Sequence, residues 1–295
     1  MSTILRFRTV PQTAIVVHGG AGRARAGTPA EDPEDHAALA SALAAAAAAL
    51  DAGAPALDAA QRAVERLEVC GRFNAGATSV PTTDGTVEMD AAVMDGATGR
   101  AGAVAAVRTP RHPVALARAV LEHSPHVLLV REGAERFGAE HGVAALPPVR
   151  HAAPFPAEPS PGTVGAVVLD AHGRLAAATS TGGMRGQLPG RVGDSPLIGA
   201  GTYAAAGACA VSASGHGEAL IRAVAAHEVA ALMTHAGLPL AAAAERVIGA
   251  IATDAALIAV DAAGAIALPF NTPIFNRGWQ RAGEPPRTAI GRAGG

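Results

Sequence analysis

Apolar residues recur along the chain in two patterns, short uninterrupted runs and longer stretches with one apolar face. The short runs are rich in Val, Ile and Ala and end at Gly, Pro or Asp, which is typical of buried strands. They predict strands at 13–17, 87–96, 101–107, 163–170, 174–181, 208–214, 257–261 and 265–270, with a further short apolar run at 126–130. The amphipathic stretches predict helices at 34–52, 56–67, 112–123, 131–141, 217–236 and 239–251.

Most of the predicted strands follow one another through short glycine-containing turns. Ala171-His172-Gly173, for example, separates the runs 163–170 and 174–181 and favours a hairpin. The sheets are therefore expected to be largely antiparallel. Each half of the chain supplies several strands and at least two helices, so the pattern predicts two sheets between two helical layers. We expect one α/β (α+β) domain over residues 1–295, a four-layer αββα sandwich.

A junction between a proline-rich segment and a strand divides the chain at Gly162 and Thr163. Proline lacks a backbone N–H and fixes its own φ, so residues 154–161 are not expected to form a helix or a central strand. A cut at the junction would give Thr163 a free amine beside its hydroxyl. Such an amine, with a pKa of about 8, is a base that activates a threonine nucleophile. A plain surface linker that leads into a strand is the alternative, and it stays open at this point.

The predicted hairpin brings polar residues to this junction. The strand 174–181 ends where the strand 163–170 begins, so Thr181 or Thr179 is expected near the Thr163 hydroxyl. Three clusters rich in glycine and polar residues lie at strand ends or in loops, where side chains can point into a common cleft. They are residues 179–183, 190–196 and 212–218.

Composition and charge exclude several classes of protein. The chain has 295 residues, 49% of them hydrophobic, and a net charge of −2 without any block of like charges. This balance gives no basis for binding nucleic acid or an anionic membrane surface. Cys70 and Cys209 are expected to be buried free thiols. The first residues have no apolar core with a cleavage site, and no apolar run reaches membrane-spanning length, so a cytoplasmic location is expected.

Three acidic residues, Glu88, Asp90 and Asp95, lie close together in the run 87–96. Such a group could suggest metal ligands. Its spacing does not match a calcium loop, which places oxygen ligands at fixed intervals around a glycine. We therefore expect these carboxylates to be solvated or hydrogen-bonded.

Eight segments, taken in order around Gly162 and Thr163, resemble the N-terminal-nucleophile asparaginase family, in the branch of plant-type L-asparaginases and β-aspartyl (isoaspartyl) peptidases. The segments are 18–22, 67–76, 85–96, 162–170, 178–183, 190–203, 211–218 and 269–279. The resemblance implies the αββα fold of N-terminal-nucleophile hydrolases and a precursor that cuts itself between Gly162 and Thr163. The products would be an α subunit of residues 1–162 and a β subunit of residues 163–295.

The resemblance also implies the reaction and the role of each site residue. Thr163 would attack the side-chain amide of L-asparagine or the isopeptide bond of a β-aspartyl dipeptide, with its own amine as base. The other implied roles are orientation of the nucleophile by Thr181, an oxyanion hole from Ser214 and Gly215, Asn74 near the scissile bond, Arg191 on the substrate α-carboxylate, Asp194 on the α-ammonium, and a carbonyl contributed by Gly217. His18 is expected to be structural, because this mechanism needs no histidine base.

Further expectations concern ions and partners. The resemblance implies small-molecule substrates, no cofactor for catalysis, and a dimer of αβ units. It also implies a structural sodium ion in the loop 67–77. The ion would be bound by the main-chain carbonyls of Leu67, Glu68, Cys70, Phe73, Ala75 and Ala77.

The sequence departs from the family pattern at several places. Ser214 stands where threonine is common, Gln187 where lysine is frequent, and Gly76-Ala77-Thr78 where the family often has Gly-x-Gly. The linker before the junction is also shorter than in many relatives, which could alter the rate of processing. Two other functions stay open, a glycosylasparaginase-like amidase and a non-catalytic scaffold that is never cut. The first typically has an acidic residue before the threonine, where this chain has Gly162.

Overall fold

The computed structural model describes residues 13–22, 32–151 and 162–291, and within them the strands form two sheets. The larger sheet has the order β12-β11-β1-β5-β6-β2-β3-β4 and the smaller one β10-β9-β8-β7. The strands of the larger sheet are β1 (Ala14–Gly22), β2 (Met89–Asp95), β3 (Ala101–Val107), β4 (Leu128–Val130), β5 (Val164–Leu169), β6 (Leu175–Thr181), β11 (Ile274–Arg281) and β12 (Arg287–Ala289). Those of the smaller sheet are β7 (Thr202–Ala204), β8 (Cys209–Gly215), β9 (Ala255–Asp261) and β10 (Ile266–Ala267).

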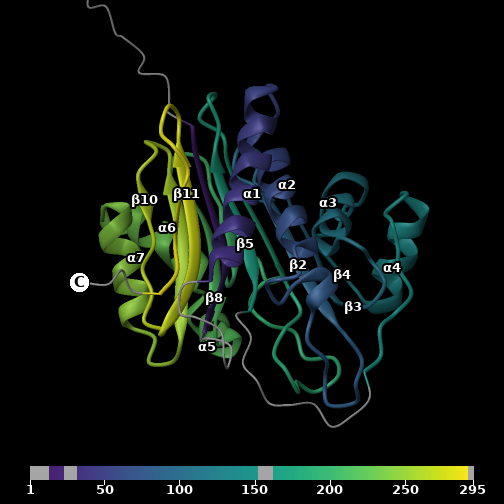
Figure 1. Cartoon of the computed structure of the whole chain (residues 1–295). Coiled ribbons are helices and arrows are strands. Elements are labelled where there is room, and N and C mark those ends of the chain that lie inside the picture. Colours follow the sequence, from purple (N-terminus) through teal and green to yellow (C-terminus); the bar gives the residue numbers. More distant parts are fainter. Residues whose placement is uncertain (1–12, 23–31, 152–161, 292–295) are drawn as a thin grey trace, which may run out of the picture.

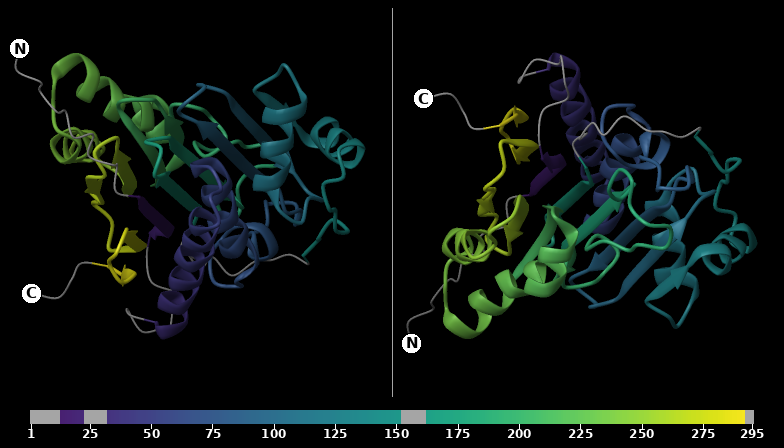
Figure 2. Two further views of the ribbon diagram at one scale, coloured as in Figure 1. Left: turned by 90° about the horizontal axis from the view of Figure 1, so that it is seen from above. Right: turned by 90° about the horizontal axis from the view of Figure 1, so that it is seen from below.

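Helices cover the outer face of each sheet, as Figures 1 and 2 show. On the larger sheet lie α1 (Pro33–Asp51), α2 (Ala56–Val69), α3 (Pro113–His123) and α4 (Arg131–Glu140), and beside the smaller sheet lie α5 (Gly217–Ala223), α6 (Ala225–Ala236) and α7 (Leu240–Gly249). The inner faces of the two sheets pack on each other through a third apolar layer. The predicted four-layer αββα sandwich is confirmed, and β3 with β4 is the one parallel pair among the strand pairs described.

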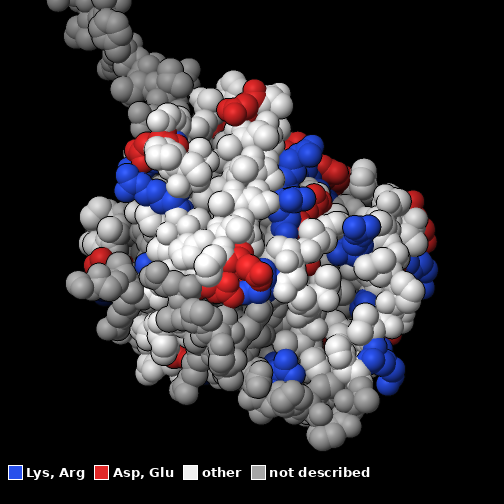
Figure 3. Space-filling view, in the orientation of Figure 1, with Lys and Arg blue, Asp and Glu red and all other residues white. Residues whose placement is uncertain are grey.

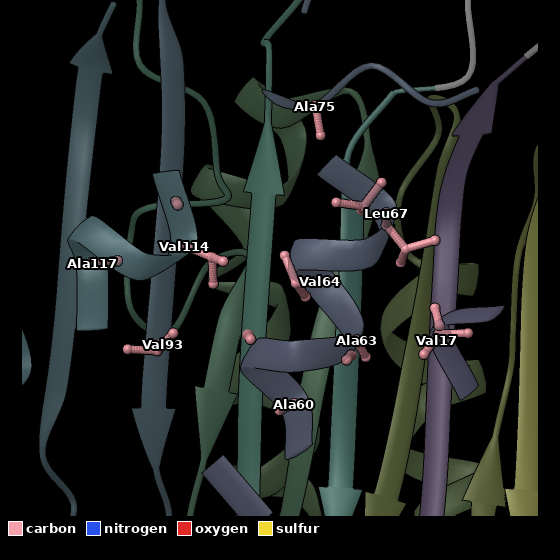
Figure 4. Packing of buried hydrophobic residues seen from close by; sticks show 14 of the residues in the cluster. Val17, Ala60, Ala63, Val64, Leu67, Ala75, Val93, Val114 and Ala117 are labelled. Carbon is pink, nitrogen blue, oxygen red and sulfur yellow. The ribbon is translucent and has the colours of Figure 1, made fainter. Parts of the chain in front are cut away.

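Small side chains let α2 lie close to the larger sheet (Figure 4). Ala60, Ala63, Val64 and Leu67 follow the helical spacing of three and four residues and are fully buried. Val17 of β1 is part of the same core. Alanine at two of these positions leaves room for the helix to pack closely on β5 and β6 in the middle of the sheet.

The fold differs from the sequence-based expectation in four places, one of which is the unpredicted strand β7, Thr202–Ala204. The predicted helix 217–236 is two helices, separated at Val224, whose φ of 48° and ψ of 44° are left-handed. The run 265–270 forms a strand over Ile266–Ala267 alone. The sequence predicted no strand after residue 270, yet β11 pairs with β1 along its whole length.

The surface and the thiols agree with most of the composition analysis. On the face in Figure 3, basic and acidic side chains of the described residues lie interspersed, and neither sign forms a continuous patch. Within the described ranges, no helix is long and apolar enough to cross a membrane. Both cysteines are free. Burial raises the pKa of Cys209 to about 12, whereas Cys70 is only half-buried, so the expectation of two buried thiols was wrong for Cys70.

Candidate active site

The hairpin of β5 and β6 brings two threonine hydroxyls together. Val164 pairs with Ser180. Thr163, which precedes Val164, and Thr181, which follows Ser180, therefore lie side by side at the open end of the hairpin. Thr163 Oγ1 donates a hydrogen bond of 3.0 Å to Thr181 Oγ1, which also accepts the Gly183 N–H at 3.0 Å. The predicted proximity of Thr181 to Thr163 is confirmed. Thr179, the other candidate, lies one repeat deeper in the same strand.

The backbone at Thr163 adopts an unfavourable conformation. Its φ is 56°, in the left-handed region that β-branched residues rarely enter. A residue held there costs on the order of 1–3 kcal/mol, and such residues cluster at functional sites. The strained torsion is the rotation about the N–Cα bond of Thr163, directly next to the peptide bond that joins Gly162 to Thr163. A cut at this bond would remove the φ constraint and release the strain.

Two strands, β8 and β1, hold the Gly162 carbonyl. Ser214 at the end of β8 donates its hydroxyl to Gly162 O at 3.2 Å, and the Ser214 oxygen in turn accepts the Ala21 N–H at 2.9 Å. Gly20 packs so tightly against Gly162 that a methyl group there would overlap the carbonyl oxygen. The hydroxyl of Ser214 is therefore aimed at the carbonyl on which negative charge develops when a nucleophile adds.

Asn74 anchors the other side of the junction. Its backbone forms a bridge with Gly162, and its side-chain amide donates to the Gly183 carbonyl at 2.6 Å. The Asn74 carboxamide oxygen accepts the Val80 N–H at 2.9 Å. Asn74 thus ties the loop after α2 to Gly162 and to the glycine turn after Thr181.

Gly215 ends β8 in a conformation that favours glycine. Its φ is 140°, and a side chain there would overlap the Asp254 carbonyl. The residue continues the β8–β9 ladder opposite Ala255. The structure places Gly215 directly after Ser214, and its N–H as an oxyanion donor stays a prediction.

An arginine with a charged partner lies next to this strand end. Glu218 binds Arg191 through both carboxylate oxygens, at 2.9 Å to Nε and 3.1 Å to Nη2. Arg191 Nη1 also donates to Gln187 Oε1 at 3.2 Å. The hydrogen bonds from Arg191 lower the pKa of Glu218 to about 2. The pair fixes the plane of the guanidinium and leaves further N–H donors for an anion.

Asp194 faces the same space through Oδ1, whereas its Oδ2 points toward Gly201. Its Oδ2 is buried and has no hydrogen-bond partner among the described residues. Burial raises the pKa of Asp194 to about 7, and the charge of Arg191 acts in the opposite direction. A Cβ on Gly217 would lie 2.7 Å from Arg191 Nη2 and 3.0 Å from Asp194 Oδ1. The three predicted substrate-binding residues are therefore together, as one positive and one acidic group separated by a glycine.

Two buried acids, Glu88 directly before β2 and Asp90 within it, hold the loop that carries Arg191, a contribution that the sequence analysis missed. Glu88 accepts the Gly190 N–H at 2.6 Å and pairs with Arg108 at 2.6 Å. Asp90, opposite Thr181 in the β2–β6 ladder, accepts the Gly193 N–H at 3.3 Å. Burial raises the pKa of Asp90 to about 6. Their spacing of two residues in a strand, which puts both on one face, was the signal available in the sequence.

The third acid of that group, Asp95, accepts hydrogen bonds from Ala97 N–H and the Thr98 hydroxyl, at 3.0 and 2.7 Å. The expectation of hydrogen-bonded acids holds for all three residues. No cluster of three or more His, Cys, Asp or Glu side chains suited to a metal occurs in the part of the chain that the structure describes.

The loop expected to hold sodium closes through its own backbone oxygens. Leu67 O accepts the Cys70 thiol at 3.1 Å, and Gly76 passes directly over the Glu68 carbonyl. Phe73 O accepts both the Ala75 N–H at 2.8 Å and the Thr78 hydroxyl at 2.5 Å. The same hydroxyl lies 3.4 Å from Ala75 O. Of the remaining expected ligands, Cys70 is the capping residue directly after α2, and Ala77 lies in the short 3-10 turn Gly76–Thr78.

The comparisons with known proteins cover most of the chain. Residues 11–158 and 149–290 match the model of a family described as asparaginase. The chain is 47% identical to an isoaspartyl peptidase of Salmonella typhimurium over 95% of this chain and 99% of the relative. It is 42% identical to a plant-type L-asparaginase of Pyrobaculum calidifontis over 92% of this chain and 98% of that protein. An isoaspartyl peptidase/L-asparaginase of Homo sapiens is 41% identical over 70% of this chain and 72% of the relative.

Proposed function

Because the chain belongs to the asparaginase family, we propose that it is a self-processing amidohydrolase with Thr163 as its nucleophile. It cuts the bond between Gly162 and Thr163 and then hydrolyses the side-chain amide of L-asparagine and the isopeptide bond of β-aspartyl dipeptides. The similar proteins named isoaspartyl peptidase and plant-type L-asparaginase support both substrates.

The observation that carries the proposal is the geometry of the uncut junction. The strained φ of Thr163 favours loss of the peptide bond, and the Ser214 hydroxyl is aimed at the Gly162 carbonyl oxygen. Thr163 Oγ1 adds to the Gly162 carbonyl carbon, the C–N bond breaks, and the nitrogen takes up the hydroxyl proton. Water then hydrolyses the resulting ester. Gly162 keeps the new carboxylate, and Thr163 keeps a free amine and its hydroxyl.

The same groups serve the second reaction. The Thr163 amine accepts the hydroxyl proton while the oxygen adds to the substrate carbonyl, and the bond to Thr181 orients that oxygen. The hydroxyl of Ser214 and the N–H of Gly215 stabilise the oxyanion, and Asn74 lies beside the scissile bond. The leaving amine takes the proton and departs as ammonia or as the α-amino group of the next residue. Water hydrolyses the β-aspartyl ester and releases L-aspartate.

The charged residues select the substrate. The N–H groups of Arg191 that Glu218 and Gln187 do not use bind the α-carboxylate, and Asp194 pairs with the α-ammonium. The position of Asp194 Oδ1 supports this assignment, because a Cβ on Gly217 would lie 3.0 Å from it and 2.7 Å from Arg191 Nη2, so both charged groups border one space. Gly217 leaves room between these two groups and contributes its carbonyl.

A structural sodium ion in the loop 67–77 is part of the proposal. Main-chain oxygens are ligands that hard cations prefer. The loop fits such an ion with one exception, Phe73, because the Ala75 N–H and the Thr78 hydroxyl use both acceptor positions of its carbonyl. The Thr78 hydroxyl has to turn away before Phe73 binds the ion. The ion would stabilise the loop that carries Asn74 and takes no part in the chemistry.

Further parts of the proposal concern the assembled enzyme. Residues 1–162 and 163–295 stay together as one αββα unit, which the shared larger sheet supports, since β1, β2, β3 and β4 come from one chain and β5, β6, β11 and β12 from the other. Two such units pair as a dimer. The enzyme needs no cofactor for catalysis and acts in the cytoplasm on small molecules.

Gel electrophoresis under denaturing conditions together with one substitution tests the function. The wild-type chain is expected to give two bands and to release ammonia from L-asparagine and leucine from β-Asp-Leu. Thr163→Ala should remain one band of 29.1 kDa without either activity, and Thr163→Ser should still be cut, since it keeps the hydroxyl. Amidase activity in Thr163→Ala would contradict the mechanism, and a wild-type chain that stays whole would point to the non-catalytic scaffold.

A further inference from the structure

A second group of buried polar side chains lies beneath the site, between the two sheets. His18 Nε2 is 2.9 Å from Ser212 Oγ, and Ser212 Oγ is 2.8 Å from Thr179 Oγ1. Thr202 Oγ1 continues the chain at 2.7 Å from Thr179 Oγ1. All four side chains are fully buried. We call His18, Thr179, Ser212 and Thr202 the inner layer.

The inner layer repeats the active site one step deeper in the same strands. Thr179 precedes Thr181 by two residues in β6, and Ser212 precedes Ser214 by two residues in β8. Side chains two residues apart in a strand point to the same face, about 6.7 Å apart along the strand. Gly165 likewise lies two residues from Thr163 in the chain, so it is the β5 residue at the level of the inner layer. A methyl group on Gly165 would overlap the Ser212 and His18 side chains.

The inner layer connects the two sheets. His18 and Thr179 belong to the larger sheet, whereas Ser212 and Thr202 belong to the smaller one. Farther from the site, the same interface is filled by apolar side chains such as Val167, Ala177 and Ile258. Apolar contacts are not directional, but hydrogen bonds fix the relative position of two groups to within a few tenths of an ångström. The directional contacts lie directly below the reacting groups.

This arrangement matters because the reacting groups are divided between the sheets. Thr163 and Thr181 are held by β5 and β6 of the larger sheet, and Ser214 by β8 of the smaller one. The distance between nucleophile and oxyanion donor therefore depends on how the sheets lie against each other. A displacement of about 1 Å between reacting groups can cost about a hundredfold in rate.

We propose that His18, Thr179 and Ser212 are positioning residues that fix the distance between the Thr163–Thr181 pair and Ser214. The proposal rests on the function above, in which Thr163 is the nucleophile and Ser214 an oxyanion donor. His18 acts in this layer as a neutral hydrogen-bonding group. Burial lowers its pKa to about 3, with an opposing effect from the Thr163 backbone, so the layer is unchanged across neutral pH.

Four single variants and the double variant Ser212→Ala/Thr179→Val test the proposal. Ser212→Ala and Thr179→Val remove one hydroxyl each with little change of volume. Thr179→Ser keeps the hydroxyl and removes only the methyl group. Val260→Ala is the matched control, because Val260 is fully buried in the same interface far along β9 from the site. For each variant we would measure the rate of cleavage at the junction, kcat and KM for L-asparagine, the pH profile of kcat, and Tm.

The expected result is a split between kcat and KM. Ser212→Ala and Thr179→Val should lower kcat and the rate of self-cleavage by about tenfold to a hundredfold. KM and the shape of the pH profile should change little, because the charged residues are untouched. Thr179→Ser should recover most of the rate. The double variant should lose no more than the stronger single variant, since both break one connected layer.

Other results would overturn the inference. If Ser212→Ala and Thr179→Val resemble Val260→Ala, with a lower Tm and unchanged kcat, the layer only stabilises the fold. A shift of the pH profile in these variants would point to acid–base chemistry by His18 and would equally contradict positioning. If Thr179→Val does not fold, Ser212→Ala carries the same test. A wild-type chain that is neither cut nor active would overturn the proposed function itself, which separates the two failures.

Discussion

Replacing Ser214 by alanine tests whether one hydroxyl serves both reactions. In the uncut chain this hydroxyl donates to the Gly162 carbonyl oxygen at 3.2 Å and is held in place by the Ala21 N–H at 2.9 Å. Ser214 is buried, with 1% of its surface exposed, so water cannot easily replace the lost donor. The substitution removes a hydrogen-bond donor at the place where negative charge forms, first on the Gly162 carbonyl oxygen and later on the substrate.

The expected loss can be estimated from oxyanion holes in other enzymes. Removal of one donor typically costs about 10²–10³ in kcat, equivalent to about 2.7–4 kcal/mol. We expect the lower end of this range, because the Gly215 N–H stays. The substitution also leaves the Ala21 N–H without its acceptor, which should lower the free energy of unfolding by about 1–3 kcal/mol.

The assay follows the first cut and then turnover. Full-length chain is purified quickly, and the fraction cleaved is read from denaturing gels over hours to days. Kinetics with L-asparagine are then measured on the cleaved fraction. Ser214→Thr keeps a hydroxyl and should retain most of both rates. If Ser214→Ala is cut and turns over substrate as fast as Ser214→Thr, the oxyanion role is refuted and the bond to Gly162 is only structural.

Three further predictions follow from neighbouring groups. A methyl group at Gly20 would overlap the Gly162 carbonyl oxygen, so Gly20→Ala should leave one full-length band on a gel, and normal maturation of that variant would contradict the close packing. Burial raises the pKa of Asp194 to about 7, and a protonated carboxyl does not attract the substrate ammonium, so KM should rise as the pH falls below about 7 while kcat changes less. A KM independent of pH between about 6 and about 8 would exclude that role for Asp194. Sodium chloride should raise Tm more than choline chloride at equal ionic strength. Thr78→Val should enlarge this difference in Tm, because it removes the hydroxyl that occupies the Phe73 carbonyl. Equal Tm values in both salts would argue against the ion.

Short-range geometry made much of the site predictable from the sequence. A turn of three residues sets the register of β5 and β6, and that register alone brings Thr163 and Thr181 together. Helices with a clear apolar stripe, such as α2 and α3, were predicted within about two residues at each end, the usual uncertainty of helix boundaries.

Elements that depend on distant partners were harder to predict. β11 contains Asn276, Arg277 and Gly278 in succession, which breaks the alternation of apolar and polar residues expected of a strand. Arg277 is nevertheless buried, because its guanidinium bonds the Phe275 and Gly291 carbonyls and lies over the Phe270 ring. These partners come from other parts of the fold, so the sequence pattern gave no signal for them.

The break between α5 and α6 had no local signal either. Val224 takes a left-handed conformation that valine disfavours, and no glycine or proline marks the place. The contacts of α6 with β8 and β7 outweigh the backbone preference of valine at this position. The carboxylates around Arg191 were missed for a similar reason, since Glu88 and Asp90 reach the loop from the start of β2, about 100 residues earlier in the chain.

N-terminal sequencing of the purified wild-type protein tests the central claim most directly. If the strained junction is the site of self-cleavage, a second N-terminus should appear that reads Thr-Val-Gly-Ala-Val-Val and begins at Thr163. It should be absent from Thr163→Ala prepared in the same way, which excludes a contaminating protease. A wild-type protein with one intact chain, or with a new terminus at any other residue, would contradict the account.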